Sequence, residues 1–293
     1  MRKAGVLLVT LAMVVVSVAH ARLSSLRRGN RRGSRRGAHP SPSRPQFRFA
    51  ALASSLVAAV CLAAVQASSA PGHSCVNGNE LWFGAADGTR LVGHRFGGER
   101  PGRRTTVVLA HQSSSDLCEW LSYARRLAAR GHFVFAFDFR GHGHSKGRPT
   151  YGRLGLDVDA ATRAVRRLGA RKVVLVGASL GGIASVVAAA STEPRVAGVV
   201  AVSAPAEIAG RLNALPAAAR VRVPSLYVAA EQDQNAPYDF AADARRLHAA
   251  TATVEKRLVL VPGSLHGVSL VAGSTRVRSL VEKFLRDPAR AVP

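Results

Sequence analysis

Acidic residues are scarce in this chain. Its 293 residues contain 17 Asp and Glu against 41 Lys and Arg, a formal net charge of +24. Nearly half of this excess lies in residues 1–75, which contain no acidic residue, and the rest is spread without a long basic block. Without a nucleic-acid-binding motif, this pattern excludes a specific nucleic-acid partner and indicates a compositional bias. Contact with an anionic cell envelope is the alternative that the charge leaves open.

Cysteine is equally rare, with three residues in the chain. Cys61 lies inside an apolar segment, which leaves Cys75 and Cys118 for the folded part. Two remaining cysteines in an exported domain are often paired. We therefore predict a disulfide between Cys75 and Cys118, worth about 3–5 kcal/mol of stability, with two unpaired thiols as the alternative.

The N-terminal quarter has the composition of targeting sequence. An apolar run over 4–19 ends in an Ala-x-Ala pattern at 19–21, and a second run over 49–65 ends in a cleavage pattern at Ala67. Between them, residues 22–48 form a linker rich in Arg, Gly, Ser and Pro that cannot bury a core. We expect a secreted or membrane-anchored protein whose second segment is the export signal. The first segment is either a membrane segment or the product of a start codon assigned too far upstream.

The remainder, residues 76–293, alternates short apolar runs with stretches of helical spacing, which predicts one α/β domain with a mostly parallel, doubly wound sheet. The predicted strands are 105–110, 132–138, 172–176, 196–202, 225–229 and 257–261. The predicted helices are 117–130, 156–168, 180–192, 238–250 and 274–286. The connection over 202–223 is too short for a large lid domain, so we expect an open site, roofed at most by a short helix near 206–219.

The strongest motif is G-A-S-L-G at 177–181, between a predicted strand and a predicted helix. This context is typical of a nucleophile elbow, with Ser179 as the nucleophile. Gly177 and Gly181 would allow the tight turn that exposes the serine hydroxyl. The backbone N–H of Leu180, at the start of the helix, would stabilise a developing oxyanion.

A nucleophilic serine needs a base, and the base needs an orienting carboxylate. Polar loops follow the last two predicted strands, at the sheet edge where α/β proteins bind ligands. His266 lies in the loop after the final strand and is the predicted base. Asp233 lies in the preceding loop and is the predicted acid, with Glu231 and Asp239 as rivals.

The loop after the first predicted strand reads H-Q-S-S-S at 111–115. We expect a second oxyanion donor there, at Ser113 or Gln112, with His111 supporting the loop. The segment D-F-R-G-H-G-H-S at 138–145 follows the next strand and is interpreted as a structural turn that braces the floor of the site. Its glycines argue against a metal site, and we expect no metal or cofactor.

With these residues assembled, the chain resembles the α/β-hydrolase superfamily over residues 80–290, and more closely the exported single-domain hydrolases of actinobacteria. The resemblance rests on the loop at 111–115, the D-x-R-G-H-G-x-S segment, the elbow at 177–181, and the positions of Asp233 and His266. It implies that residues 76–293 are a catalytic domain in which Ser179 attacks an acyl carbon and water later releases the acyl group. Many relatives have His-Gly in the oxyanion loop, where this chain has His111-Gln112.

The expected activity is hydrolysis of a small-molecule or lipid-like carboxylic ester. A peptidase or an acyltransferase of the cell envelope would use the same three residues, so both remain alternatives. A non-catalytic, basic envelope-binding protein of this fold is the alternative from another class. An intact Ser-His-Asp set argues against it, since a binding scaffold has no physical need for all three groups.

Overall fold

The computed structural model describes residues 75–76, 80–102, 104–235 and 237–292. Every element named below belongs to the compact unit Ser69–Pro293. The predicted targeting segments and the arginine-rich linker lie outside the described residues. Among the described helices, none has both the length and the apolar character needed to cross a membrane.

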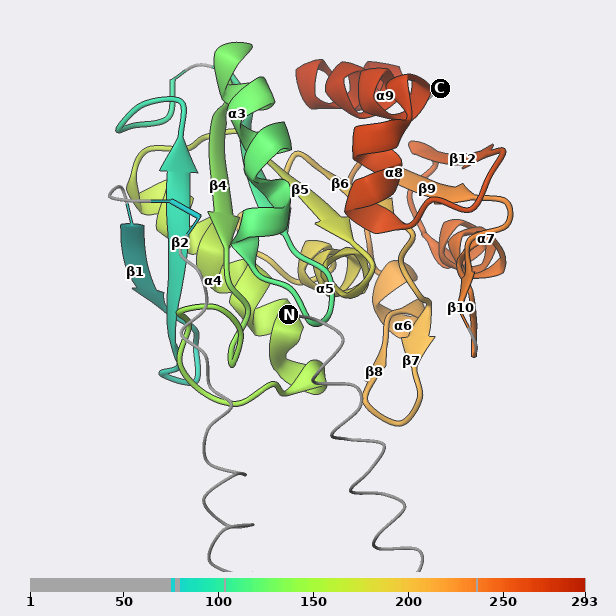
Figure 1. Cartoon of the computed structure of the whole chain (residues 1–293), viewed down its shortest axis with the longest axis horizontal. Helices are drawn as coiled ribbons and strands as arrows, with labels where there is room; N and C mark the ends of the chain where they lie inside the picture. The colour runs from blue at the N-terminus through green and yellow to red at the C-terminus, as the bar shows by residue number, and fades with distance from the viewer. Residues whose placement is uncertain (1–74, 77–79, 103, 236, 293) are drawn as a thin grey trace, which may run out of the picture. The chain divides into compact units, whose positions relative to one another are not determined.

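An eight-stranded sheet in the order β1-β2-β4-β3-β5-β6-β9-β12 forms the centre of this unit (Figure 1). Strand β2 pairs antiparallel with β1 and β4, and all other neighbours in the sheet are parallel. The strands are β1 Glu80–Gly84, β2 Arg90–Phe96, β3 Thr106–Ala110, β4 Phe133–Phe137, β5 Val173–Ala178, β6 Gly198–Val202, β9 Ser225–Ala230 and β12 Lys256–Val261. The mostly parallel sheet predicted from the sequence is confirmed.

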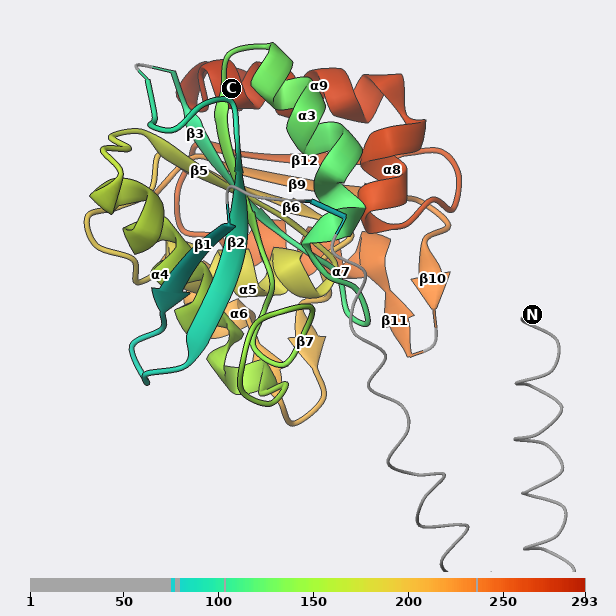
Figure 2. The same cartoon turned by 60° about the vertical axis from the view of Figure 1, so that its left-hand side comes forward.

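Helices cover both faces of the sheet because the inner strands are apolar on both faces. Along β3, Val108 packs in one core with α4 and α5, while Val107 packs in a second core with α3 and α9. Figure 2 shows α3, α8 and α9 on one side of the sheet and α4 and α5 on the other. The helices are η1 Leu117–Trp120, α3 Leu121–Ala129, η2 Tyr151–Arg153, α4 Leu154–Arg167, α5 Leu180–Ala189, α7 Phe240–Ala250, α8 Gly267–Gly273, α9 Thr275–Arg286 and η3 Ala289–Ala291.

The segment expected to form a short roofing helix near 206–219 is mostly a hairpin instead. Strands β7 Glu207–Ile208 and β8 Leu212–Asn213 pair antiparallel, and only α6 Leu215–Ala218 is helical. Gly210, with a φ of +63°, permits the turn between the two strands. A similar hairpin, β10 Gln234–Asn235 and β11 Tyr238–Asp239, follows β9. The described residues contain no separate lid domain, in agreement with the sequence analysis.

Candidate active site

Ser179 occupies a sharp turn between β5 and α5. Its φ of +50° and ψ of −115° lie outside the regions that L-residues favour, so the backbone is strained there. A Cβ on Gly177 would lie 2.1 Å from the Gly181 carbonyl oxygen, and a Cβ on Gly181 would lie 2.1 Å from the Ala110 carbonyl oxygen. The turn therefore requires glycine at both positions, and its close packing holds the serine at the carboxyl edge of the sheet.

His266 and Asp233 form a hydrogen-bonded pair after β12 and β9. The His266 Nδ1–H donates to Asp233 Oδ1 at 2.9 Å, and Asp233 Oδ2 lies 3.0 Å from the same nitrogen. The carboxylate side chain is 4% exposed and the imidazole 34%. Phe240 packs against the ring, with centroids 4.4 Å apart. This arrangement fixes the imidazole plane and leaves Nε2 without the proton, able to accept one.

The two rivals of Asp233 have other places in the structure. Asp239 caps α7 by accepting the backbone N–H of Ala242 at 2.9 Å. Glu231 is exposed. Only Asp233 is both buried and paired with the histidine.

Two hydrogen bonds anchor the backbone directly after His266. The Gly267 N–H donates to Ser203 Oγ at 3.0 Å, and the Val268 N–H donates to Gln112 Oε1 at 3.1 Å. The Gly267 φ of +52° favours glycine next to the histidine, and a Cβ there would lie 1.7 Å from that same amide oxygen. Ser203 was not predicted as a site residue, although its position directly after the apolar strand β6 was an available signal.

Gln112 is tied on its other side to Glu119 of η1. Its backbone N–H donates to Glu119 Oε1 at 2.6 Å, and its Nε2 donates to Glu119 Oε2 at 3.1 Å. Burial raises the pKa of the Glu119 carboxyl, and the bonds from Gln112 oppose that shift. The Gln112 N–H is thus engaged and cannot serve as the second oxyanion donor, which corrects one of the two expectations. Ser113, the other expected donor, lines the pocket with Leu180.

His111 is wholly buried and supports the loop, as its sequence position suggested. The Phe139 N–H donates to His111 Nε2 at 3.0 Å, so the ring proton lies on Nδ1, which donates to the Gln112 carbonyl at 2.7 Å. Burial lowers the pKa of His111 to about 3, which keeps the ring neutral.

The D-F-R-G-H-G-H-S segment is held by hydrogen bonds and ion pairs to the chain around it. The Asp138 carboxylate accepts the backbone N–H groups of Leu117 and His144, and Arg140 pairs with the carboxylates of Asp157 and Asp87. This segment is a brace, because these contacts join it to η1, to α4 and to the turn between β1 and β2. No cluster of metal-ligating side chains is present in the part of the chain that the structure describes.

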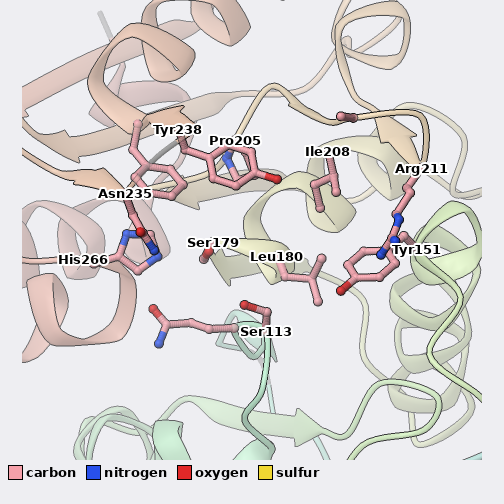
Figure 3. Close-up of a pocket in the computed structure, with 13 residues that line it drawn as sticks. Ser113, Tyr151, Ser179, Leu180, Pro205, Ile208, Arg211, Asn235, Tyr238 and His266 are labelled. Atoms are coloured by element: carbon pink, nitrogen blue, oxygen red, sulfur yellow. The ribbon is translucent and has the colours of Figure 1, made fainter. Parts of the chain in front are cut away.

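A cavity of about 530 Å³ opens above these loops, and Ser179 and His266 both line it (Figure 3). Apolar side chains from the β7–β8 region, α5 and α7 share the wall with polar ones. The lining residues are Gln112, Ser113, Tyr151, Ser179, Leu180, Pro205, Ile208, Ala209, Arg211, Asn235, Tyr238, Phe240 and His266. A volume of this size is typical of small-molecule sites.

A disulfide joins Cys75 to Cys118, with their Cα atoms 5.6 Å apart. Cys118 lies in η1, immediately before the glutamate that holds Gln112. The crosslink therefore ties the start of the described chain to the helix that supports the site.

Comparisons with known proteins identify the same fold. Residues 105–220 match the family described as alpha/beta hydrolase fold. The uncharacterized protein YfhR of Escherichia coli is 34% identical over 106 residues, which cover 34% of this chain and 37% of YfhR. Human alpha/beta hydrolase domain-containing protein 17C is 31% identical over 111 residues, covering 36% of this chain and 34% of the relative. The aligned stretch thus spans about a third of each curated relative.

Solved structures extend the likeness to most of the described chain. The esterase Pf2001 of Pyrococcus furiosus superposes with a TM-score of 0.59 and 18% identity, over 72% of this chain and 92% of the esterase. The enol-lactonase of Burkholderia xenovorans gives a TM-score of 0.57 and 21% identity, over 69% and 99% of the two chains. Together with the sheet and its flanking helices, these matches show that the described domain has the α/β-hydrolase fold.

Proposed function

We propose that the protein is a serine hydrolase that cleaves carboxylic esters through an acyl-enzyme, with Ser179 as nucleophile, His266 as base and Asp233 as its orienting acid. One observation carries the proposal: the imidazole paired with buried Asp233 lines the same cavity as the strained serine. A hydrolase is also what the superfamily and its esterase-named members favour.

In this mechanism, His266 Nε2 accepts the Ser179 proton as Oγ attacks the ester carbonyl carbon. Asp233 holds the imidazole in the required tautomer and stabilises the imidazolium that forms. The backbone N–H groups of Leu180 and Ser113 would donate to the oxyanion of the tetrahedral intermediate. The imidazolium then protonates the leaving alcohol, and water, activated by the same base, releases the acid and regenerates the serine.

The first experiment is labelling of the purified protein with a fluorophosphonate probe, located by peptide mass spectrometry. We expect an adduct on Ser179 that the Ser179→Ala variant lacks, together with hydrolysis of short p-nitrophenyl esters by the wild type alone. A folded protein that neither carries the adduct nor hydrolyses any ester would contradict the proposal.

The proposal includes a site of action outside the cytoplasmic membrane, as the N-terminal apolar segments suggest. The Cys75–Cys118 disulfide supports this location, because disulfides form and persist mainly in oxidising compartments.

A further inference from the structure

Arg211 brings a positive charge into the wall of the cavity. It lies in the turn between β7 and β8, where its backbone N–H donates to the Ile208 carbonyl at 2.8 Å. Its guanidinium carbon lies 5.2 Å from the centroid of the Tyr151 ring, at the start of η2. Contact with an aromatic face holds an arginine in place while leaving its N–H groups available to a ligand.

No carboxylate neutralises this charge in the described part of the chain. None of the 13 residues that line the cavity is an Asp or Glu, and no ion pair involves Arg211 among the described residues. The nearby cations differ: Arg153 pairs with Asp87 at 2.8 Å, and Arg140 pairs with both Asp87 and Asp157. An arginine that is held at a cavity wall and has no acidic partner there is suited to bind a carboxylate of the substrate.

The position of Arg211 relative to the reacting groups indicates which part of the substrate it would meet. Figure 3 shows Ser179 and Leu180 between His266 at one end of the cavity and Arg211 with Tyr151 at the other. Because His266 protonates the leaving alcohol, the alcohol must lie at the histidine end. The acyl chain then extends toward Arg211.

We propose that the substrates are esters whose acyl part ends in a carboxylate, such as half-esters of short dicarboxylic acids, and that Arg211 binds this carboxylate. The inference rests on the proposed function, since it assigns the two ends of the cavity from the roles of Ser179 and His266. Leu180, Ile208 and Pro205 would contact the methylene chain between the ester and the distal charge.

The test compares two esters of equal acyl length, mono-p-nitrophenyl glutarate and p-nitrophenyl pentanoate, which differ in a terminal carboxylate or methyl group. We expect the wild type to favour the glutarate ester by about tenfold in kcat/KM, because the arginine–carboxylate pair forms with only the charged ester. In Arg211→Gln the ratio of the two kcat/KM values should fall about tenfold. Measuring both esters on one preparation makes the ratio independent of the folded fraction.

Arg220→Gln is the matched control. Arg220 is exposed, donates to the Pro216 carbonyl and does not line the cavity, so its loss changes the net charge equally and should leave the ratio unchanged. A wild type without preference for the charged ester, or an Arg211→Gln variant that keeps the preference, would overturn the inference while the serine hydrolase proposal stands.

Binding of glutarate to the Ser179→Ala protein, measured by calorimetry, provides a second readout that needs no turnover. We expect the affinity to fall about tenfold when Arg211→Gln is added. If glutarate binding depends on Arg211 but the wild-type protein hydrolyses no ester, the proposed function would be contradicted and the anion site would stand. Glutarate that does not bind, or binds independently of Arg211, would overturn the inference.

Discussion

At the residue scale, Gly181 lies against the end of β3 so closely that no side chain fits. The atoms that a Cβ would meet are the carbonyl oxygens of Ala110, at 2.1 Å, and His111, at 2.7 Å. Both belong to the backbone, which cannot move aside as a flexible side chain could. The turn that carries the strained serine is thus packed against the end of β3, whose position is set by the sheet.

We therefore expect Gly181→Ala to lower the free energy of unfolding by at least about 2 kcal/mol, and to abolish labelling of Ser179 even where the variant remains folded. Chemical denaturation and probe labelling measure the two effects. Gly84→Ala is the control, because Gly84 lies in an exposed strand position with nothing within 4 Å of its Cβ and should be nearly neutral. Equal stability of the two variants would contradict this account.

At the scale of elements, the site depends on a chain of contacts that joins three loops. Glu119 of η1 holds Gln112 of the β3 loop, and the Gln112 side chain holds the first turn of α8 next to His266. The side chain that interrupts the His-Gly pattern of many relatives thus couples the oxyanion loop to the loop of the base. Gln112 acts through these loops and is a positioning residue.

Gln112→Ala removes both side-chain contacts and leaves the Val268 N–H without this acceptor. We expect kcat for a neutral p-nitrophenyl ester to fall about tenfold through misplacement of His266, with a smaller change in KM. Gln234→Ala, at an exposed position of β10, should leave both constants unchanged. A Gln112→Ala variant that retained the wild-type kcat would contradict a role in catalysis for the contact between the two loops.

At the scale of the whole molecule, the disulfide links residues 43 positions apart and crosses from the chain before β1 to η1. A crosslink stabilises a fold chiefly by reducing the conformational freedom of the unfolded chain, and a loop of this size is worth about 4 kcal/mol. Because Glu119 of η1 holds Gln112, the stability of η1 also affects the position of the site loops.

The double variant Cys75→Ser/Cys118→Ser should accordingly unfold about 10 °C below the oxidised wild type, as should wild type held in reductant. Calorimetry of the three samples measures the shift. The Ser179 labelling rate at 25 °C should stay within about twofold, because the noncovalent contacts of η1 remain. Melting points that coincide would contradict the stabilising role of the disulfide.

The mostly parallel strands, the elbow, and the acid and base loops could be predicted from local sequence. Apolar runs covered on both faces specify parallel strands, and the carboxyl ends of such strands meet at one edge, so Ser179, Asp233 and His266 were expected to lie near each other. The strands β1 and β2 and the short helix α8 were not predicted. For the exposed edge strand β1 and the brief helix α8, the reason is that such segments carry a weak periodic signal.

Only the tertiary structure decided which neighbours each side chain meets. Gln112 and Ser113 are adjacent in sequence and were equal as donors, but Glu119, brought in by η1, engages the Gln112 N–H. Apart from α6, the roof at 206–219 became a hairpin because residues paired across a glycine turn, an interaction that helical spacing does not report. Arg211 contacts the ring of Tyr151, which lies 60 positions earlier in the sequence, because the β7–β8 turn packs near η2. Local sequence thus specified the elements and their chemistry, whereas contacts between distant segments decided the lining and charge of the cavity.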